Sequence, residues 1–94
     1  MLKPGLALDT RVDKNVMGYE RTLPCFWSTQ LGDAMRLVEA MHNTWSFHFN
    51  KKVWTVKCDP RNNIHSSVVF EAQAEELPYA ICICALRACG IPVD

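Results

Sequence analysis

The sequence predicts an α+β fold, a three-stranded antiparallel meander with flanking helices in the order α-α-β-β-β-α. Apolar residues recur at helical spacing in two N-terminal segments and in one C-terminal segment, whereas the middle of the chain alternates with a period of two. The connections within the alternating part are short, which favours a meander of neighbouring strands. A chain of 94 residues has room for one core, so residues 1–94 are expected to form a single domain.

Two amphipathic helices are expected in the N-terminal half. The first covers about residues 5–17 and ends at Gly18, and the second covers about residues 30–42 with Ser28 or Thr29 as its N-cap. The first helix has apolar residues at Leu6, Leu8, Val12, Val16 and Met17, with Asp9, Arg11, Asp13 and Lys14 between them. The second has an apolar stripe of Leu31, Ala34, Met35, Val38 and Met41. Both sets are expected to pack in the core, and a loop with Pro24 separates the helices.

Alternation of apolar and polar residues predicts a β-hairpin over about residues 45–58, with its turn near Asn50-Lys51-Lys52. Phe47 and Phe49 alternate with polar residues before the turn, and Trp54, Val56 and Cys58 alternate with polar residues after it. Residues 59–63 are rich in turn formers, and residues 67–72 are expected to form the third strand.

A last helix is expected over residues 74–89, where Gly90 and Pro92 end it. Cys82 and Ile83 make this helix apolar beyond one stripe, which indicates either deep burial or a partner on its second face. A homo-oligomer is expected for this reason.

Charge and length exclude several classes of protein. Ten acidic residues balance ten basic ones without long runs of either sign, so a nucleic-acid partner is not expected. No stretch approaches the roughly 20 apolar residues of a membrane span, and the N-terminus is too short and interrupted for a secretory signal. We therefore expect a cytoplasmic protein without a membrane partner.

The cysteines and histidines do not form a recognisable metal site. Five cysteines in a cytoplasmic chain indicate free buried thiols instead of disulfides. Cys82 and Cys84 are separated by about 200° around a helix, so both sulfurs cannot easily reach one ion. His42 and His48 are expected to be exposed polar residues.

We find no catalytic motif. The sequence has no phosphate-binding Gly-x-x-x-x-Gly-Lys loop, no Gly-x-Ser-x-Gly elbow and no His-Glu-x-x-His helix. Neither an enzymatic activity nor a cofactor is expected.

The segment from residue 19 to residue 30 is the best candidate for a ligand site. Aromatic rings can stack on a base, a guanidinium can bridge a phosphate, and hydroxyls at a helix N-terminus add donors for an anion. The proposed ligand-binding residues are Tyr19, Arg21, Trp27, Ser28 and Thr29. In the alternative interpretation Tyr19 and Trp27 are core anchors, like Trp45 and Trp54, and Ser28 only caps the second helix.

Three separated blocks resemble the phage ABA-sandwich domain. They are Leu8-Asp9 leading to Val16-Met17-Gly18-Tyr19, then Pro24 with Trp27-Ser28-Thr29, and finally Leu77-Pro78-Tyr79-Ala80-Ile81-Cys82 with Ala85-Leu86. The resemblance spans nearly the whole chain. It implies a phage or prophage origin and a sheet flanked by helices, and it implies no enzyme activity.

By analogy with small phage proteins, we expect a non-catalytic protein that sequesters a nucleotide-type immune signal, such as a cyclic nucleotide or a cyclic ADP-ribose, in the infected bacterial host. One alternative is a protein-interaction factor that blocks a host protein. A less favoured alternative is a double-stranded-RNA-binding module, which shares the order α-β-β-β-α. Such a module would place lysines near the start of its last helix, where this chain has Glu75 and Glu76.

Overall fold

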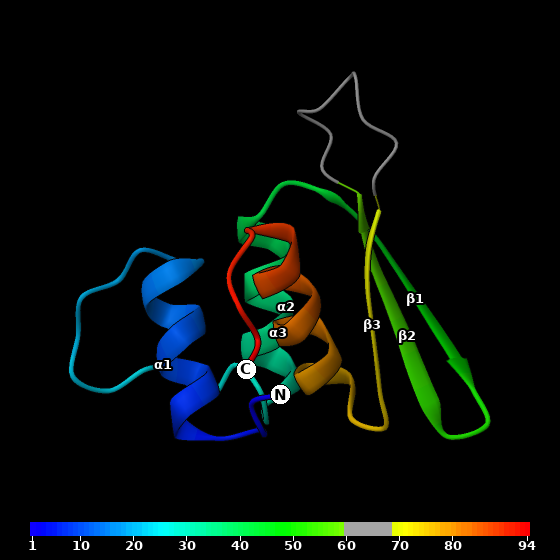
Figure 1. Ribbon diagram of the computed structural model, residues 1–94, viewed down its shortest axis with the longest axis horizontal. Coiled ribbons are helices and arrows are strands. Elements are labelled where there is room, and N and C mark those ends of the chain that lie inside the picture. The colour runs from blue at the N-terminus through cyan, green and yellow to red at the C-terminus, as the bar shows by residue number, and fades with distance from the viewer. Residues whose placement is uncertain (60–68) are drawn as a thin grey trace.

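The computed structural model describes residues 1–59 and 69–94 and confirms the α+β fold and its order of elements (Figure 1). The helices of the described part are α1 (Leu6–Asn15), α2 (Leu31–Ala40) and α3 (Leu77–Ala88). Its strands are β1 (Thr44–Asn50), β2 (Val53–Asp59) and β3 (Phe70–Ala74).

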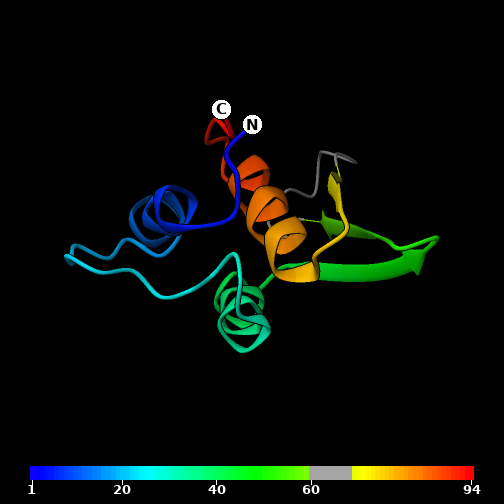
Figure 2. The ribbon, with the colours of Figure 1, turned by 90° about the horizontal axis from the view of Figure 1, so that it is seen from below.

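Helix α3 is the central element of the molecule. It packs against β2 and β3 on one side and against α1 and α2 on the other (Figures 1 and 2). Every residue from Ala80 to Leu86 is buried. The deep burial inferred from the sequence is confirmed, and the second apolar face of α3 is covered within the chain. This face therefore gives no reason to expect an oligomer, and the homo-oligomer stays a prediction.

The three strands form one antiparallel sheet in the order β1-β2-β3, with Val56 opposite both Phe47 and Ala72. Lys51 and Lys52 form the hairpin tip with positive φ angles of 51° and 67°, as in the tight turns that match the strand twist. Helix α3 covers β2 and β3 (Figure 2). Strand β1 is largely exposed, and its Phe49 side chain is 55% exposed.

The third strand begins at Phe70 and reaches Ala74, beyond the expected end at residue 72. Pairing with β2 continues as far as Trp54 and Ala74, so the ladder keeps the chain extended up to the residues before α3. The parts of the expected turn and strand at residues 60–68 lie outside the described residues.

Helix α1 is shorter than expected and ends at Asn15 instead of residue 17. Gly18, which follows the helix, adopts a left-handed φ of 71°. The predicted cap of α2 is wrong: Gln30 is its N-cap, and no side chain caps the helix. The hydroxyl of Ser28 instead accepts a hydrogen bond from the Gly5 amide at 2.9 Å. This contact connects the α1–α2 loop (residues 16–30) to the start of α1.

The predicted stripes of α1 and α2 are partly wrong. Leu6, Leu31 and Met35 are exposed. Ala34 and Leu37 form the fully buried face of α2, because this helix packs on α3 along a narrow face. In α1 not only Leu8 and Val12 are buried but also Asp9 and Asp13, which the sequence pattern placed among the polar residues.

The two termini lie side by side, and the C-terminal segment is hydrogen-bonded to α1 through Arg11 (Figure 1). The Leu2 amide donates to the Val93 carbonyl at 2.6 Å, and the Arg11 guanidinium donates to the carbonyls of Pro92 and Asp94 at 2.8 and 2.9 Å. Among residues 1–59 and 69–94, no helix is both long and apolar enough to cross a membrane.

Candidate functional site

Two carboxylates lie on the buried side of α1. Asp9 is 3% exposed and Asp13 is 2% exposed, and each follows a core residue, Leu8 or Val12. Residues four apart on a helix share one face, so both side chains point toward the α1–α2 loop. The sequence pattern missed this burial, although the spacing of four and the neighbouring core residues were visible signals of a shared face.

Asp13 has a complete set of partners. Arg21 donates to it from Nε at 2.9 Å and from Nη2 at 2.7 Å, and Trp27 donates from Nε1 at 3.1 Å. The hydrogen bonds from Arg21 hold the pKa of Asp13 below its usual value, against the opposing effect of burial. This carboxylate therefore fastens the loop to α1.

Asp9 is compensated less fully. Its Oδ1 accepts the Ser28 amide at 2.8 Å. Within the described part of the chain, no donor forms a hydrogen bond to Oδ2 and no cation pairs with this carboxylate. Asp9 lies in the first turn of α1, where the helix dipole favours a negative charge.

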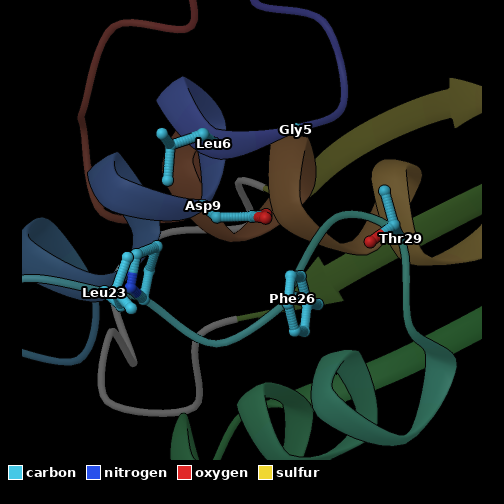
Figure 3. A pocket seen from close by; sticks show the side chains of 7 residues that line it. Gly5, Leu6, Asp9, Leu23, Phe26 and Thr29 are labelled. Carbon is cyan, nitrogen blue, oxygen red and sulfur yellow. The ribbon is translucent and has the colours of Figure 1, made fainter.

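A pocket of about 330 Å³ opens beside Asp9, between α1 and the α1–α2 loop (Figure 3). Helix α1 contributes Leu6 and Asp9, and the loop contributes Leu23, Phe26 and Thr29 from the facing side. The complete lining consists of Gly5, Leu6, Asp9, Leu23, Pro24, Phe26 and Thr29. The pocket thus combines mainly apolar walls with one ionisable group.

Three large apolar side chains at the rim of this pocket are strongly exposed. Leu6 is 66% exposed, Leu23 is 74% exposed and Phe26 is 64% exposed. The Phe26 amide donates to Asp33 of α2 at 3.0 Å, so the backbone that carries this ring is fixed. Such a group of large exposed side chains around one concavity is typical of a binding surface.

The ligand-binding residues expected from the sequence divide between two places. Tyr19, Arg21 and Trp27 meet around Asp13, with the Arg21 guanidinium 4.5 Å from the centre of the Tyr19 ring. Trp27 is fully buried, as the alternative interpretation expected, whereas Tyr19 is exposed and is not a core anchor. Ser28 is buried: its hydroxyl accepts from the Gly5 amide and its own amide donates to Asp9. Thr29 lines the pocket.

The five thiols differ in burial. Cys58, Cys82 and Cys84 are buried as expected, whereas Cys25 is half-buried and Cys89 is exposed. Burial raises the pKa of the Cys84 thiol to about 12 and also raises the pKa of Cys82, so both thiols stay protonated at neutral pH. His42 and His48 are exposed, as predicted, and no three potential metal ligands cluster within residues 1–59 and 69–94.

No family model matches this chain, and no curated protein matches it. Among solved structures, the chain is similar to a phage protein from Bacillus cereus ATCC 14579. The TM-score is 0.76 and the identity is 21%, over 92% of this chain and 91% of that chain. At this identity the likeness shows that the two chains share a fold.

Proposed function

We propose that this chain is a non-catalytic phage protein of the infected bacterial cytoplasm that acts by binding a host protein. The shared fold with a phage protein supports the origin, and the resemblance to the phage ABA-sandwich domain stays a prediction. The pocket beside α1 supports the mode of action. Its apolar rim would form the centre of the contact with the partner.

The exposure of Leu6, Leu23 and Phe26 around one pocket carries this proposal. Isolated exposed apolar residues are ordinary, but clusters of them around a concavity are typical of interaction sites. Burying them against a partner stabilises a complex by about 25 cal/mol for each Å² of apolar surface removed from water. Protein interfaces have such an apolar centre surrounded by polar residues.

The same pocket is a poor site for a nucleotide. Asp9 is its ionisable lining residue, and a carboxylate repels the phosphates of a nucleotide. The volume of about 330 Å³ lies at the lower end of the range of small-molecule pockets, which starts at about 300 Å³. A single side chain of a protein partner fits these properties better.

The test compares three immobilised proteins in lysate of a bacterial host: the wild type, Phe26→Ser and Phe49→Ser. Phe26 and Phe49 are both aromatic and about equally exposed, but Phe49 lies on the hairpin away from the pocket. We expect a protein that is retained by the wild type and by Phe49→Ser but not by Phe26→Ser. An identical set of retained proteins on all three surfaces would contradict the proposal.

Sequestration of a nucleotide signal is a second candidate, and one observation favours it. Tyr19 and Arg21 stack at the surface, where a ring and a guanidinium could contact a base and a phosphate. Arg21 already uses Nε and Nη2 on Asp13, which leaves fewer donors for a ligand.

Native mass spectrometry with cyclic oligonucleotides and cyclic ADP-ribose isomers tests this candidate and reports the oligomeric state together with any bound mass. We expect Tyr19→Ala to lose such a ligand while keeping the fold, since Tyr19 is exposed. Trp27→Ala is unsuitable, because removing a buried ring disturbs the core. A wild-type protein that retains none of the panel removes sequestration from consideration.

A further inference from the structure

We infer that the pocket beside α1 receives the end of a lysine or arginine side chain, whose cationic head binds Asp9 and whose methylene stem lies against the apolar walls. This inference rests on the proposed function, because it names the chemical group by which a protein partner enters the pocket. It is based on two observations: Asp9 has fewer partners than Asp13, and the walls of the pocket beside Asp9 are mainly apolar.

The charge of Asp9 is the first reason. A buried carboxylate is costly unless it is hydrogen-bonded and paired, and Asp13 meets this condition through Arg21 and Trp27. Asp9 has the Ser28 amide on one oxygen, and no further donor to this carboxylate is found among the described residues. Its other oxygen is not fully enclosed by the protein, so a group in the pocket can reach it. A cation from outside the chain would supply for Asp9 what Arg21 supplies for Asp13.

The position of the carboxylate is the second reason. Asp9 is only 3% exposed, yet it is one of the residues that line the pocket. Figure 3 shows its side chain extending from α1 toward the loop that carries Phe26 and Thr29. A group that enters between α1 and the loop would therefore meet the carboxylate after passing the apolar rim.

The walls are the third reason. Lysine and arginine have long apolar stems with a charge at the tip, and they bury the stem along apolar surface. Leu6, Leu23 and Phe26 offer such a surface at the rim, and Asp9 offers the opposite charge inside. A neutral apolar side chain would leave Asp9 without a cation, and an acidic one would be repelled.

The experiment is a titration of the isotope-labelled wild-type protein with three blocked amino acids, followed by nuclear magnetic resonance. The probes are Nα-acetyl-lysine amide, Nα-acetyl-arginine amide and the neutral Nα-acetyl-norleucine amide. The amides of Gly5 and Ser28 report on the pocket, because they donate to Ser28 and Asp9 respectively. We expect one cationic probe to bind about tenfold more tightly than norleucine amide, the factor that a net charge-assisted hydrogen bond of about 1.4 kcal/mol provides.

Two matched variants isolate the charge of Asp9. Asp9→Asn keeps an oxygen that can accept the Ser28 amide, whereas it removes the negative charge from the pocket. Glu39→Gln removes the same charge from an exposed carboxylate of α2 that does not line the pocket. We expect Asp9→Asn to bind the cationic probes and norleucine amide equally, and Glu39→Gln to keep the preference of the wild type.

Failure of this inference differs from failure of the proposed function. Equal binding of the charged and neutral probes by the wild type, or no binding of either cationic probe, would overturn the cation pocket whether or not the variants fold. In that case a host protein lost by Phe26→Ser would still support a protein-binding surface. Cationic binding that Asp9→Asn abolishes, combined with unchanged retention by Phe26→Ser, would point to a free amine or guanidine as ligand and overturn the role of a protein side chain.

Discussion

Asp13 and Asp9 lie one turn apart on the same helix and are buried to the same degree, but they serve different regions of the molecule. The Asp13 region is closed by an ion pair with Arg21 and by the fully buried ring of Trp27. The Asp9 region is closed by backbone contacts from Ser28 on one side and opens into a pocket on the other.

The difference originates in the α1–α2 loop. Where the loop passes Asp13 it contributes a cation and an indole donor, and where it passes Asp9 it contributes apolar side chains and a backbone amide. The two aspartates lie on the same helix and are equally buried, but Asp13 holds the loop on α1 whereas Asp9 belongs to a candidate binding site. A buried charged group whose compensation within the chain is incomplete is a candidate for a functional site.

The largest expected effect separates two neighbouring aromatic residues of the loop. We expect Trp27→Ala to lower the free energy of unfolding by about 4 kcal/mol, because it removes a fully buried ring and the donor to Asp13. Phe26→Ala, at the exposed rim, should cost less than about 0.5 kcal/mol. Urea denaturation of both variants checks this, and similar costs would show that the pocket rim is part of the core.

An intermediate effect separates the two carboxylates. Asp13→Asn should lower the free energy of unfolding by about 2 kcal/mol, because it weakens the charge-assisted contacts from Arg21. Asp9→Asn should change it by less than about 0.5 kcal/mol, since the amide oxygen can still accept from Ser28. Chemical denaturation at neutral pH measures both losses. An equal loss for the two variants would mean that Asp9, like Asp13, stabilises the contact between the loop and α1.

The smallest effect concerns the pH dependence of the Arg21 contact. The folded pKa of Asp13 lies below its ordinary value of 3.8, so between these values the unfolded chain binds more protons and stability rises with pH. The contribution is present above pH 3.8 and is lost as the pH falls through the folded pKa. We expect Arg21→Ala to destabilise the fold less than Asp13→Asn does at neutral pH, because Arg21 is partly exposed to screening solvent.

Unfolding free energies of the wild type and Arg21→Ala should therefore converge only as the pH is lowered below 3.8. Arg21→Lys serves as the companion variant, because a lysine keeps the charge but cannot donate from two nitrogens to one carboxylate. A difference between wild type and Arg21→Ala that is constant with pH would mean that Arg21 acts through packing on Tyr19 instead of through Asp13.

Much of the fold was predictable because periodicity reports which face of an element is buried. The alternation from Trp45 to Cys58 predicted the hairpin, and helical spacing with Gly90 predicted α3 and its end. The stripe of α2 failed at Leu31 and Met35, because periodicity does not tell how wide a face the neighbouring helix covers. The cap failed at Ser28, because a hydroxyl that suits a helix start can also serve a distant amide.

The candidate site was less predictable. The sequence identified the loop and placed Thr29 in the ligand site, but it missed the pocket and its carboxylate. Asp9 was assigned to the polar side of its helix, and Leu6 to the core, whereas the first is buried and the second is exposed. Their environments depend on which loop residues pass each turn of α1, and this is a contact between segments that local spacing does not encode.

The sequence by itself determined the α+β class, the order of the elements and the helical and extended segments, because these follow from local spacing and from glycine and proline at the ends. The tertiary structure alone decided that α3 is covered on both faces, that Arg21 is held by Asp13 and that Asp9 faces a pocket. Each of these depends on residues far apart in the chain meeting in space. Burial, and with it the energetic demand of a charge, is set by those meetings and not by the residue type.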